Sequence, residues 1–469
     1  MKNLLAKIAY NTIIQVVSKV VTSILGLIAI AIVARYLGQT GFGEYITIIT
    51  FLSFFAILSD FGLTLVATQM ISELNADKNK ILSNIFTFRL ISTIVLLVFA
   101  VLIIFFFPYN KSIKLGVIIA ATSFLFIALT QILTSLFQKK LKMERVCIAE
   151  IVGRLVLVFG IIVVVKCNFG LISILITTVC SSAINFFLLF FLSKRFVQIK
   201  LEFDFSIWRT TIKKAWPLSL TIALNLIYLK ADTLILSLVK TQAEVGIYGA
   251  SYRAIDVLIT LPFMFAGIIL PVLTIKWAEK KQDDFKRVLQ KSFDFMIVLA
   301  IPLIVGAQFL SKQIMVLIAG EKFIASGSVL KILIIAIGAI FIGCIFSHAI
   351  IAVNKQKCLI KAYVFAGVIA LIGYLIFIPR YSYVGAAWVT IFIELFIAGA
   401  TGYYVWKYTQ FFPNFKMTIK SLIACSIMAL TLYVLPINMN LFIVLFLSII
   451  IYFASLAVLT NTQHTTHNT

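Results

Sequence analysis

The sequence predicts an all-α polytopic membrane protein with about 14 transmembrane helices. Hydrophobic residues make up 62% of the chain and charged residues only 12%. Apolar stretches of about 20 residues, the length that crosses a bilayer as a helix, recur along the whole chain. Alternating ten-residue segments, which would indicate a membrane β-barrel, are missing. Helices also satisfy all their backbone polar groups within lipid, so each apolar stretch is expected to be helical.

The expected spans follow one another closely, and no connection is long enough for a soluble domain of ordinary size. The first span follows the short basic start MKNLLAK. It is too long for the apolar part of a signal peptide and lacks a small-residue cleavage site, so we expect it to be retained. The expected spans cover residues 13–34, 44–72, 81–107, 113–138, 146–165, 169–193, 215–239, 245–271, 292–311, 328–353, 359–378, 384–406, 417–435 and 441–460.

Lysine and arginine alternate between the two sides of these spans. The side of the N-terminus carries 26 of the 40 basic residues, and the other side carries 9. By the positive-inside rule, both termini are expected to be cytoplasmic in a cytoplasmic (inner) membrane, which agrees with an even number of spans. The net charge of +23 is therefore explained by topology, and no nucleic acid partner is expected.

The chain looks internally doubled. Gly43-Glu44-Tyr45 follows the first expected span, and Gly246-Ile247-Tyr248 follows the seventh. Six spans separate the two motifs, so the two units have the same orientation, as in transporters built from parallel repeats. We therefore expect an N-terminal six-helix lobe over residues 1–200, a C-terminal six-helix lobe over 201–412, and two additional helices with a polar tail over 413–469.

Sequence signatures of enzymes are missing. The chain has no phosphate-binding loop of the G-x-x-x-x-G-K-[ST] type, no H-E-x-x-H and no G-x-S-x-G. Its six cysteines and three histidines are scattered, without the spacing of metal ligands. We therefore expect a protein that is not an enzyme and that has neither a metal site nor a cofactor.

Five cations fall inside expected spans, where a charge costs roughly 2.5–3.5 kcal/mol on insertion scales. Such residues usually face a cavity or a partner, so an excess of positive charge favours an anionic cargo. Two of the five have an acid on their own helix and could instead form a structural ion pair with it. Two others lie near a span end and could reach the interface. The five cations are Lys19, Arg89, Arg154, Lys230 and Arg253.

Other polar residues lie on single helix faces within the spans. Asn11, Gln15 and Ser23 share a face with Lys19 at helical spacing, and Asn225, Tyr228 and Asp232 make a similar stripe. Burial can raise a carboxyl pKa towards neutrality, so buried acids are candidates for coupling to H⁺ or Na⁺ or for a charge network. Pairing across helices with the cations is the alternative. The candidate acids are Asp60, Asp232, Asp256 and Glu394.

Several motifs together resemble the polysaccharide flippases, the O-antigen or Wzx-type members of the MATE-like MOP superfamily. The resemblance covers about residues 5–410. In the first half it rests on Leu37-Gly38, Phe42-Gly43-Glu44-Tyr45 and Ser59-Asp60-Phe61-Gly62-Leu63. In the second half it rests on Trp216-Pro217-Leu218-Ser219, Lys230-Ala231-Asp232, Val245-Gly246-Ile247-Tyr248 and Gly385-Ala386-Ala387.

The resemblance implies two six-helix lobes in a V, with two appended helices, around a cationic central cavity. It implies alternating access that moves a polyprenyl-diphosphate-linked oligosaccharide, the repeat unit of a surface polysaccharide, from the inner to the outer leaflet. The five cations and, in the outer loop motif, Arg35 would line this cavity. Membrane lipid and the glycosyltransferases or polymerase of polysaccharide assembly would be partners. An ion-coupled small-molecule exporter of the MATE type and a flippase for lipid II-type peptidoglycan precursors are the alternatives.

Overall fold

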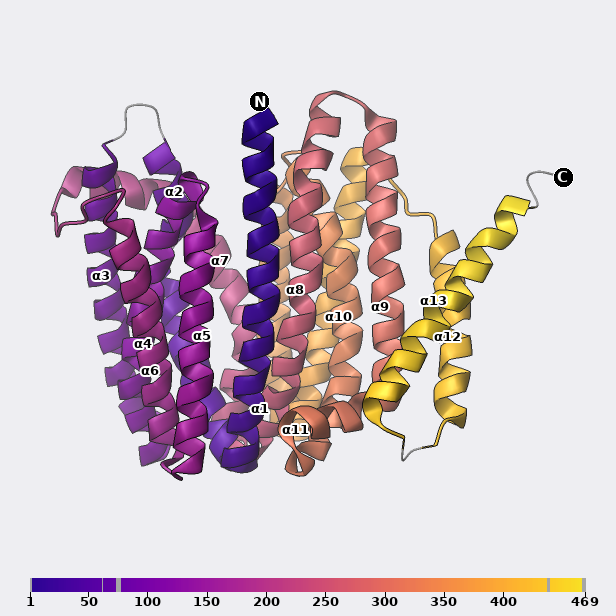
Figure 1. Ribbon diagram of the computed structural model, residues 1–469, viewed down its shortest axis with the longest axis horizontal. Coiled ribbons are helices and arrows are strands. Elements are labelled where there is room, and N and C mark those ends of the chain that lie inside the picture. Colours follow the sequence, from indigo (N-terminus) through magenta and orange to yellow (C-terminus); the bar gives the residue numbers. More distant parts are fainter. Residues whose placement is uncertain (1, 61, 73–76, 437–438, 466–469) are drawn as a thin grey trace. The chain divides into compact units, whose positions relative to one another are not determined.

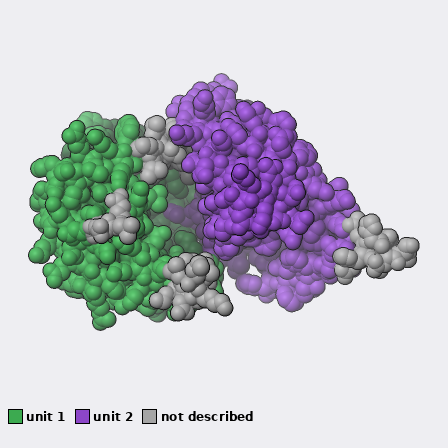
Figure 2. All heavy atoms as spheres, turned by 90° about the horizontal axis from the view of Figure 1, so that it is seen from above, with its two compact units in different colours: residues 1–249 green, residues 250–469 purple. Residues whose placement is uncertain are grey.

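The computed structural model describes residues 2–60, 62–72, 77–436 and 439–465, except for the side chains of residues 2–9, 12, 217–229 and 461–465. The chain forms two compact units, unit 1 over Met1–Gly249 and unit 2 over Ala250–Thr469, which are coloured separately in Figure 2. The boundary therefore falls inside a helix rather than near residue 200. The helix before it packs against the first three helices of the chain, which explains its place in unit 1. The lobe boundaries expected from the repeat stay a prediction.

Unit 1 is built from long helices that run side by side (Figure 1). A polar side chain caps the start of three of these helices: Asp77 caps α3, Asn110 caps α4 and Asp204 caps α7. The elements are α1 (Lys2–Asp60), α2 (Leu63–Ser72), α3 (Lys78–Ile103), the 3₁₀ turn η1 (Ile104–Phe106), α4 (Lys111–Lys139), α5 (Met143–Lys166), α6 (Gly170–Ser193), α7 (Phe205–Val239) and the first residues of α8 (Gln242–Ala278).

Unit 2 continues along α8, and its described residues form helices joined by short connections, with no strand among them. Helix α10 is its most buried helix and packs against both α9 and α11. Helices α12 and α13 pair with each other and contact α9. The further elements are α9 (Gln282–Ala319), the 3₁₀ turn η2 (Glu321–Phe323), α10 (Ile324–Ala352), α11 (Lys357–Thr409), α12 (Lys416–Val434) and α13 (Leu441–Thr465).

Within the described residues, 11 helical stretches are long and apolar enough to cross a membrane. Two of them, Ile13–Ser72 and Lys357–Thr409, each contain two of the expected spans. The fourteen expected spans thus fall on these stretches and on α7. The all-α, many-span class predicted from composition and hydropathy is confirmed.

Two changes of direction are hidden inside long helices. Gly38 in α1 has φ 66° and ψ −174°, and Ser382 in α11 has φ 53° and ψ −138°. Both positions lie between two expected spans, so each marks a turn rather than a continuous helix. A third break was not expected from the sequence. The span expected over residues 44–72 is interrupted between Asp60 and Leu63, where Gly62 has φ 75°, a backbone conformation that glycine adopts without strain.

Two glycines of the doubled motif meet in unit 1. A Cβ on Gly43 would lie 1.7 Å from the carbonyl oxygen of Gln242, and a Cβ on Gly246 would lie 2.1 Å from that of Gln39. The second half of α1 and the start of α8 therefore approach backbone to backbone, and each glycine makes room for the other helix. Thr47 adds a hydrogen bond of 2.7 Å to the side chain of Gln242.

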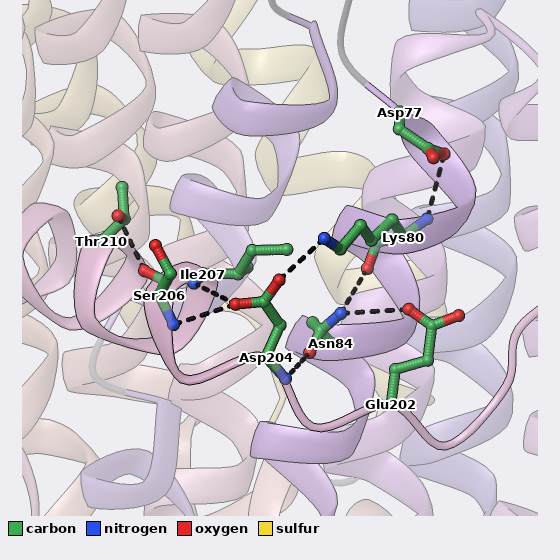
Figure 3. A network of polar contacts seen from close by, with 8 residues as sticks. All are labelled: Asp77, Lys80, Asn84, Glu202, Asp204, Ser206, Ile207 and Thr210. Carbon is green, nitrogen blue, oxygen red and sulfur yellow. Dashed lines mark hydrogen bonds and ion pairs between the residues drawn. The ribbon is translucent and has the colours of Figure 1, made fainter.

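The segment between α6 and α7 is extended and lies along the start of α3. Every second backbone N–H of this segment donates to a side chain of α3, as Lys200 does to Ser83, Glu202 to Thr87 and Asp204 to Asn84. Figure 3 shows the end of this ladder, where Lys80 also forms an ion pair of 2.8 Å with Asp204. Every second residue of the extended segment thus faces one side of α3, and this row of hydrogen bonds sets the position at which α7 begins.

Candidate functional site

A polar cavity of about 270 Å³ lies among α1, α4, α5 and α6 of unit 1. Two of the predicted cations line it, Lys19 from α1 and Arg154 from α5, together with Glu150. We call it the Lys19–Arg154 cavity. Its remaining polar lining consists of Thr22, Ser123, Thr178, Ser181, Ser182 and Asn185.

The cavity carries more positive than negative charge. Glu150 interacts electrostatically with both Lys19 and Arg154, so one acid is shared between two bases. The guanidinium of Arg154 extends towards α1, where its Nη1 lies 4.0 Å from the position a Cβ would take on Gly26. Two helices that are distant in sequence thus bring their cations to one place.

The hydroxyl groups of the cavity do not add free donors. Thr22 donates to the carbonyl of Ser18, Ser181 to that of Gly153, and Thr178 to that of Ile174. A hydroxyl that donates its hydrogen to the backbone can only accept a further hydrogen bond. The donors left for a ligand are therefore the basic groups of Lys19 and Arg154 and the amide N–H₂ of Asn185.

Close packing of α5 on α6 shapes one wall. A Cβ on Gly153 would lie 3.1 Å from the Cβ of Asn185 and 3.2 Å from the carbonyl oxygen of Ser181, so glycine permits the approach. The Oδ1 atom of Asn185 is buried without a hydrogen-bond partner. An orphaned buried acceptor still needs a hydrogen-bond donor, such as a water molecule.

A second charged group lies where the helix break occurs. Arg89 of α3 is 1% exposed, and its Nη2 lies 3.2 Å from Asp60 and 2.9 Å from the side-chain oxygen of Gln131. Thr64, in the first turn of α2, donates to Asp60. The Nε and Nη1 atoms of Arg89 are buried without partners. The structure thus pairs Asp60 with Arg89 across helices and places neither in the Lys19–Arg154 cavity.

The predicted stripe on α7 is described only in part. Asp232 is fully buried and accepts a hydrogen bond of 2.8 Å from Tyr248, which ties α7 to the start of α8. Lys230 is half-buried. The side chains of Asn225 and Tyr228 lie outside the described residues.

The residues of the predicted stripe on α1 do not share one environment. Asn11 is buried, donates to the carbonyl of Leu141 and accepts from the backbone N–H of Met143, both at 2.8 Å. Its amide therefore clamps the turn between α4 and α5. Gln15 is exposed and donates to the carbonyl of Asn11, and Ser23 is half-buried.

The other predicted residues do not line the Lys19–Arg154 cavity. Arg253 and Asp256 belong to unit 2 and form an ion pair of 3.5 Å on α8, the structural pairing that their spacing allowed. Glu394 is buried in unit 2, at 5% exposure. Arg35 is exposed near the end of the first half of α1. A role for these residues in binding or coupling stays a prediction.

Sequence reasoning missed the contribution of α6 to the cavity. Thr178, Ser181, Ser182 and Asn185 recur every three or four residues on an otherwise apolar helix, which is the same signal that identified the stripe on α1. Because none of them is charged, they stood out less than the cations.

Taken together, the long apolar helices are those of a multi-pass membrane protein. The family model for "Polysaccharide biosynthesis protein" matches residues 8–275, which is more than half of the chain. The chain belongs to this polysaccharide biosynthesis protein family. No curated protein matches the chain significantly.

Solved structures show the same fold in known flippases and transporters. The lipid II flippase MurJ, in an inward closed conformation, matches with a TM-score of 0.81 at 17% identity, over 97% of this chain and 99% of that one. An inward-facing multidrug resistance MATE family transporter of the MOP superfamily matches with 0.68 at 14% identity, over 85% and 97%. A MOP superfamily transporter from Pyrococcus furiosus, described as having a binding pocket of reverse polarity, matches with 0.58 at 13% identity, over 86% and 95%.

These matches confirm the expected family and the MurJ/MATE-like fold. The fold is the one seen in these flippase and transporter structures.

Proposed function

We propose that the protein is a flippase that moves a polyprenyl-diphosphate-linked oligosaccharide from the inner to the outer leaflet of the cytoplasmic membrane by alternating access. The observation that carries the proposal is the Lys19–Arg154 cavity, in which two cations face one acid between helices that are long and apolar enough to cross a membrane. We assign this cavity to the diphosphate of the cargo.

The chemistry of the cargo matches the donors of the cavity. A diphosphate that leaves water needs its hydration replaced, and charge-assisted hydrogen bonds from lysine and arginine are the strongest replacement. Arginine adds a planar fork that fits phosphate oxygens in pairs. The polyprenyl chain can stay in the bilayer, and the sugars can remain in water, so few dedicated sugar contacts are required.

Glu150 has a separate role in this scheme. In the empty cavity it shares the charge of Lys19 and Arg154, and an arriving diphosphate competes with it for both bases. Such competition keeps binding reversible, because the cations are never left without an anion. Coupling to H⁺ or Na⁺ through Asp60, Asp232, Asp256 or Glu394 belongs to the same proposal, as does a cytoplasmic position for both termini.

The charge of the cavity disfavours the main alternative. An exporter of small cationic molecules needs an acid-rich site, and here the basic side chains outnumber Glu150. A flippase for lipid II-type precursors would need the same cationic headgroup site, because its cargo is also a polyprenyl diphosphate. The two are distinguished by the sugar and not by the headgroup site.

The test is transport of a labelled polyprenyl-diphosphate oligosaccharide by the purified protein in liposomes. The fraction of label that becomes accessible to a membrane-impermeant reagent on the opposite leaflet measures flipping. We expect Arg154→Gln to slow flipping at least about tenfold, because one charge-assisted hydrogen bond contributes roughly 1.5–3 kcal/mol. The matched control is Lys166→Gln, which removes one exposed charge from the end of the same helix.

The control should flip at the wild-type rate. Equal rates for Arg154→Gln, Lys19→Gln and the wild type would contradict the assignment of the cavity. In cells, loss of the gene should cause the lipid-linked oligosaccharide to accumulate on the cytoplasmic leaflet. We expect the glycosyltransferases and polymerase of surface polysaccharide assembly to act before and after this step.

A further inference from the structure

Three cations surround one aromatic ring at the face of unit 1 where α4 ends and α5 begins. The ring is that of Phe196, just beyond α6. Its centroid lies 5.7 Å from Nζ of Lys140, 5.2 Å from Nζ of Lys142 and 4.8 Å from Cζ of Arg145. We call these four residues the Phe196 cluster.

The fold holds the cluster together. The turn between α4 and α5 is tight, with Leu141 at φ 51° and a hydrogen bond from the N–H of Lys142 to the carbonyl of Phe137. Asn11 clamps the same turn from α1. The ring of Phe196 packs edge-on against Phe137 at 5.9 Å. The cations are therefore gathered by the backbone of the turn and do not merely share a surface.

No ion pair with a described acidic side chain balances the charge of the cluster. Among the described residues, no salt bridge involves Lys140, Lys142 or Arg145, although Glu144 is next to Arg145 in sequence. The Nη1 atom of Arg145 is buried without a hydrogen-bond partner. An aromatic ring attracts each cation only weakly at such a site, whereas the three like charges repel one another. An anion with several acceptor oxygens would satisfy both the charge and the orphaned donor.

The position of the cluster limits what that anion can be. It lies where three membrane-crossing helices end, which is the depth of lipid headgroups. Apolar side chains border it: Ile148, one helical turn beyond Arg145, is 57% exposed, and Phe191 of α6 is 59% exposed. Lys194 extends the positive charge, with its Nζ 5.0 Å from the Phe191 ring. A ligand with an anionic head and apolar chains fits these surroundings.

We propose that the Phe196 cluster binds the phosphate headgroup of an anionic membrane phospholipid. The phosphate oxygens accept from Arg145 and lie between the two lysines, and the acyl chains run along the apolar surface of α5 and α6. This site is distinct from the Lys19–Arg154 cavity and does not rest on the proposed transport function.

The test is lipid binding by purified, delipidated protein, measured by native mass spectrometry during titration with phosphatidylglycerol or phosphatidylcholine. We expect the wild type to prefer phosphatidylglycerol. The triple variant K140Q/K142Q/R145Q should lose this preference, with at least about 50-fold weaker binding to the site, since each basic residue near an anionic headgroup contributes about fivefold. The matched control K111Q/K114Q/K166Q removes three charges from the opposite helix ends and should bind as the wild type does.

A single variant tests the proposal even if the triple variant does not fold. Lys140→Gln changes an exposed side chain and should weaken binding about fivefold. Unchanged binding in both variants, or equal binding of the two phospholipids by the wild type, would overturn the proposal. Displacement of phosphatidylglycerol by an equimolar polyprenyl diphosphate from the wild type would also overturn it, because the site would then belong to the transported lipid.

Discussion

Replacing Asp60 with alanine should destabilise the protein more than replacing Arg89 with methionine, although both changes break the same ion pair. The two partners differ in their access to water. Arg89 is 1% exposed, whereas the side chain of Asp60 is 23% exposed. The cost of breaking a buried pair depends on which charge is left behind.

The magnitudes follow from this difference. Without Asp60, Arg89 keeps one hydrogen bond, to Gln131, and its other four N–H groups have no partner among the described residues. An uncompensated buried charge costs about 3–5 kcal/mol. Without Arg89, Asp60 keeps the hydrogen bond from Thr64 and part of its hydration. Methionine fills much of the vacated volume, so we expect a loss of about 1–2 kcal/mol.

The assay is thermal unfolding of the purified variants in one detergent, followed by tryptophan fluorescence. Membrane proteins of this size often unfold irreversibly, so apparent midpoints are compared at a single scan rate. We expect the order wild type, Arg89→Met, Asp60→Ala from most to least stable. The double variant should lie near Arg89→Met, because the orphaned guanidinium is then absent.

The reasoning would be refuted by an Asp60→Ala midpoint equal to or above that of Arg89→Met. It would also be refuted by a double variant as unstable as Asp60→Ala, since the buried cation would then not be the source of the loss. Either result would mean that Asp60 matters to stability for a reason other than charge balance.

Two further predictions concern unit 1. Gly43→Ala places a Cβ 1.7 Å from the carbonyl oxygen of Gln242, so it should lower stability by about 1–3 kcal/mol or prevent folding. The control Gly267→Ala meets open space and should change little. Membrane levels and apparent unfolding midpoints measure both effects. The hydrogen bond from Lys80 lowers the pKa of Asp204, so this carboxylate stays charged throughout the pH range above the ordinary aspartate pKa. The hydrogen bonds between the linker and α3 should therefore persist in that range and weaken only as the pH falls below the ordinary aspartate pKa. The protection factors of the linker amides, which correct for the faster intrinsic exchange at higher pH, should therefore be equal at pH 6 and pH 8 and lower in Asp204→Asn at both. A lower protection factor of the wild type at pH 8 would contradict this sign.

The sequence by itself determined the class of the protein and the position of nearly every membrane helix. Hydropathy decides these features locally, because a helix in lipid must satisfy its own backbone and needs about 20 apolar residues to cross. The turn at Gly38 also agreed with the loop expected between the first two spans. The cations were visible for the same local reason, since a charge stands out in any apolar segment.

Only the tertiary structure decided which of these cations act together. Lys19 and Arg154 share a cavity because α1 packs beside α5, and Arg89 joins Asp60 because α3 also packs against α1. Contacts of this kind depend on the rotation and register of packed helices, and helical periodicity gives a face but not its neighbour. Asn11 shows the limit clearly: its spacing placed it on the stripe of Lys19, whereas the fold uses its amide to clamp a turn 130 residues away.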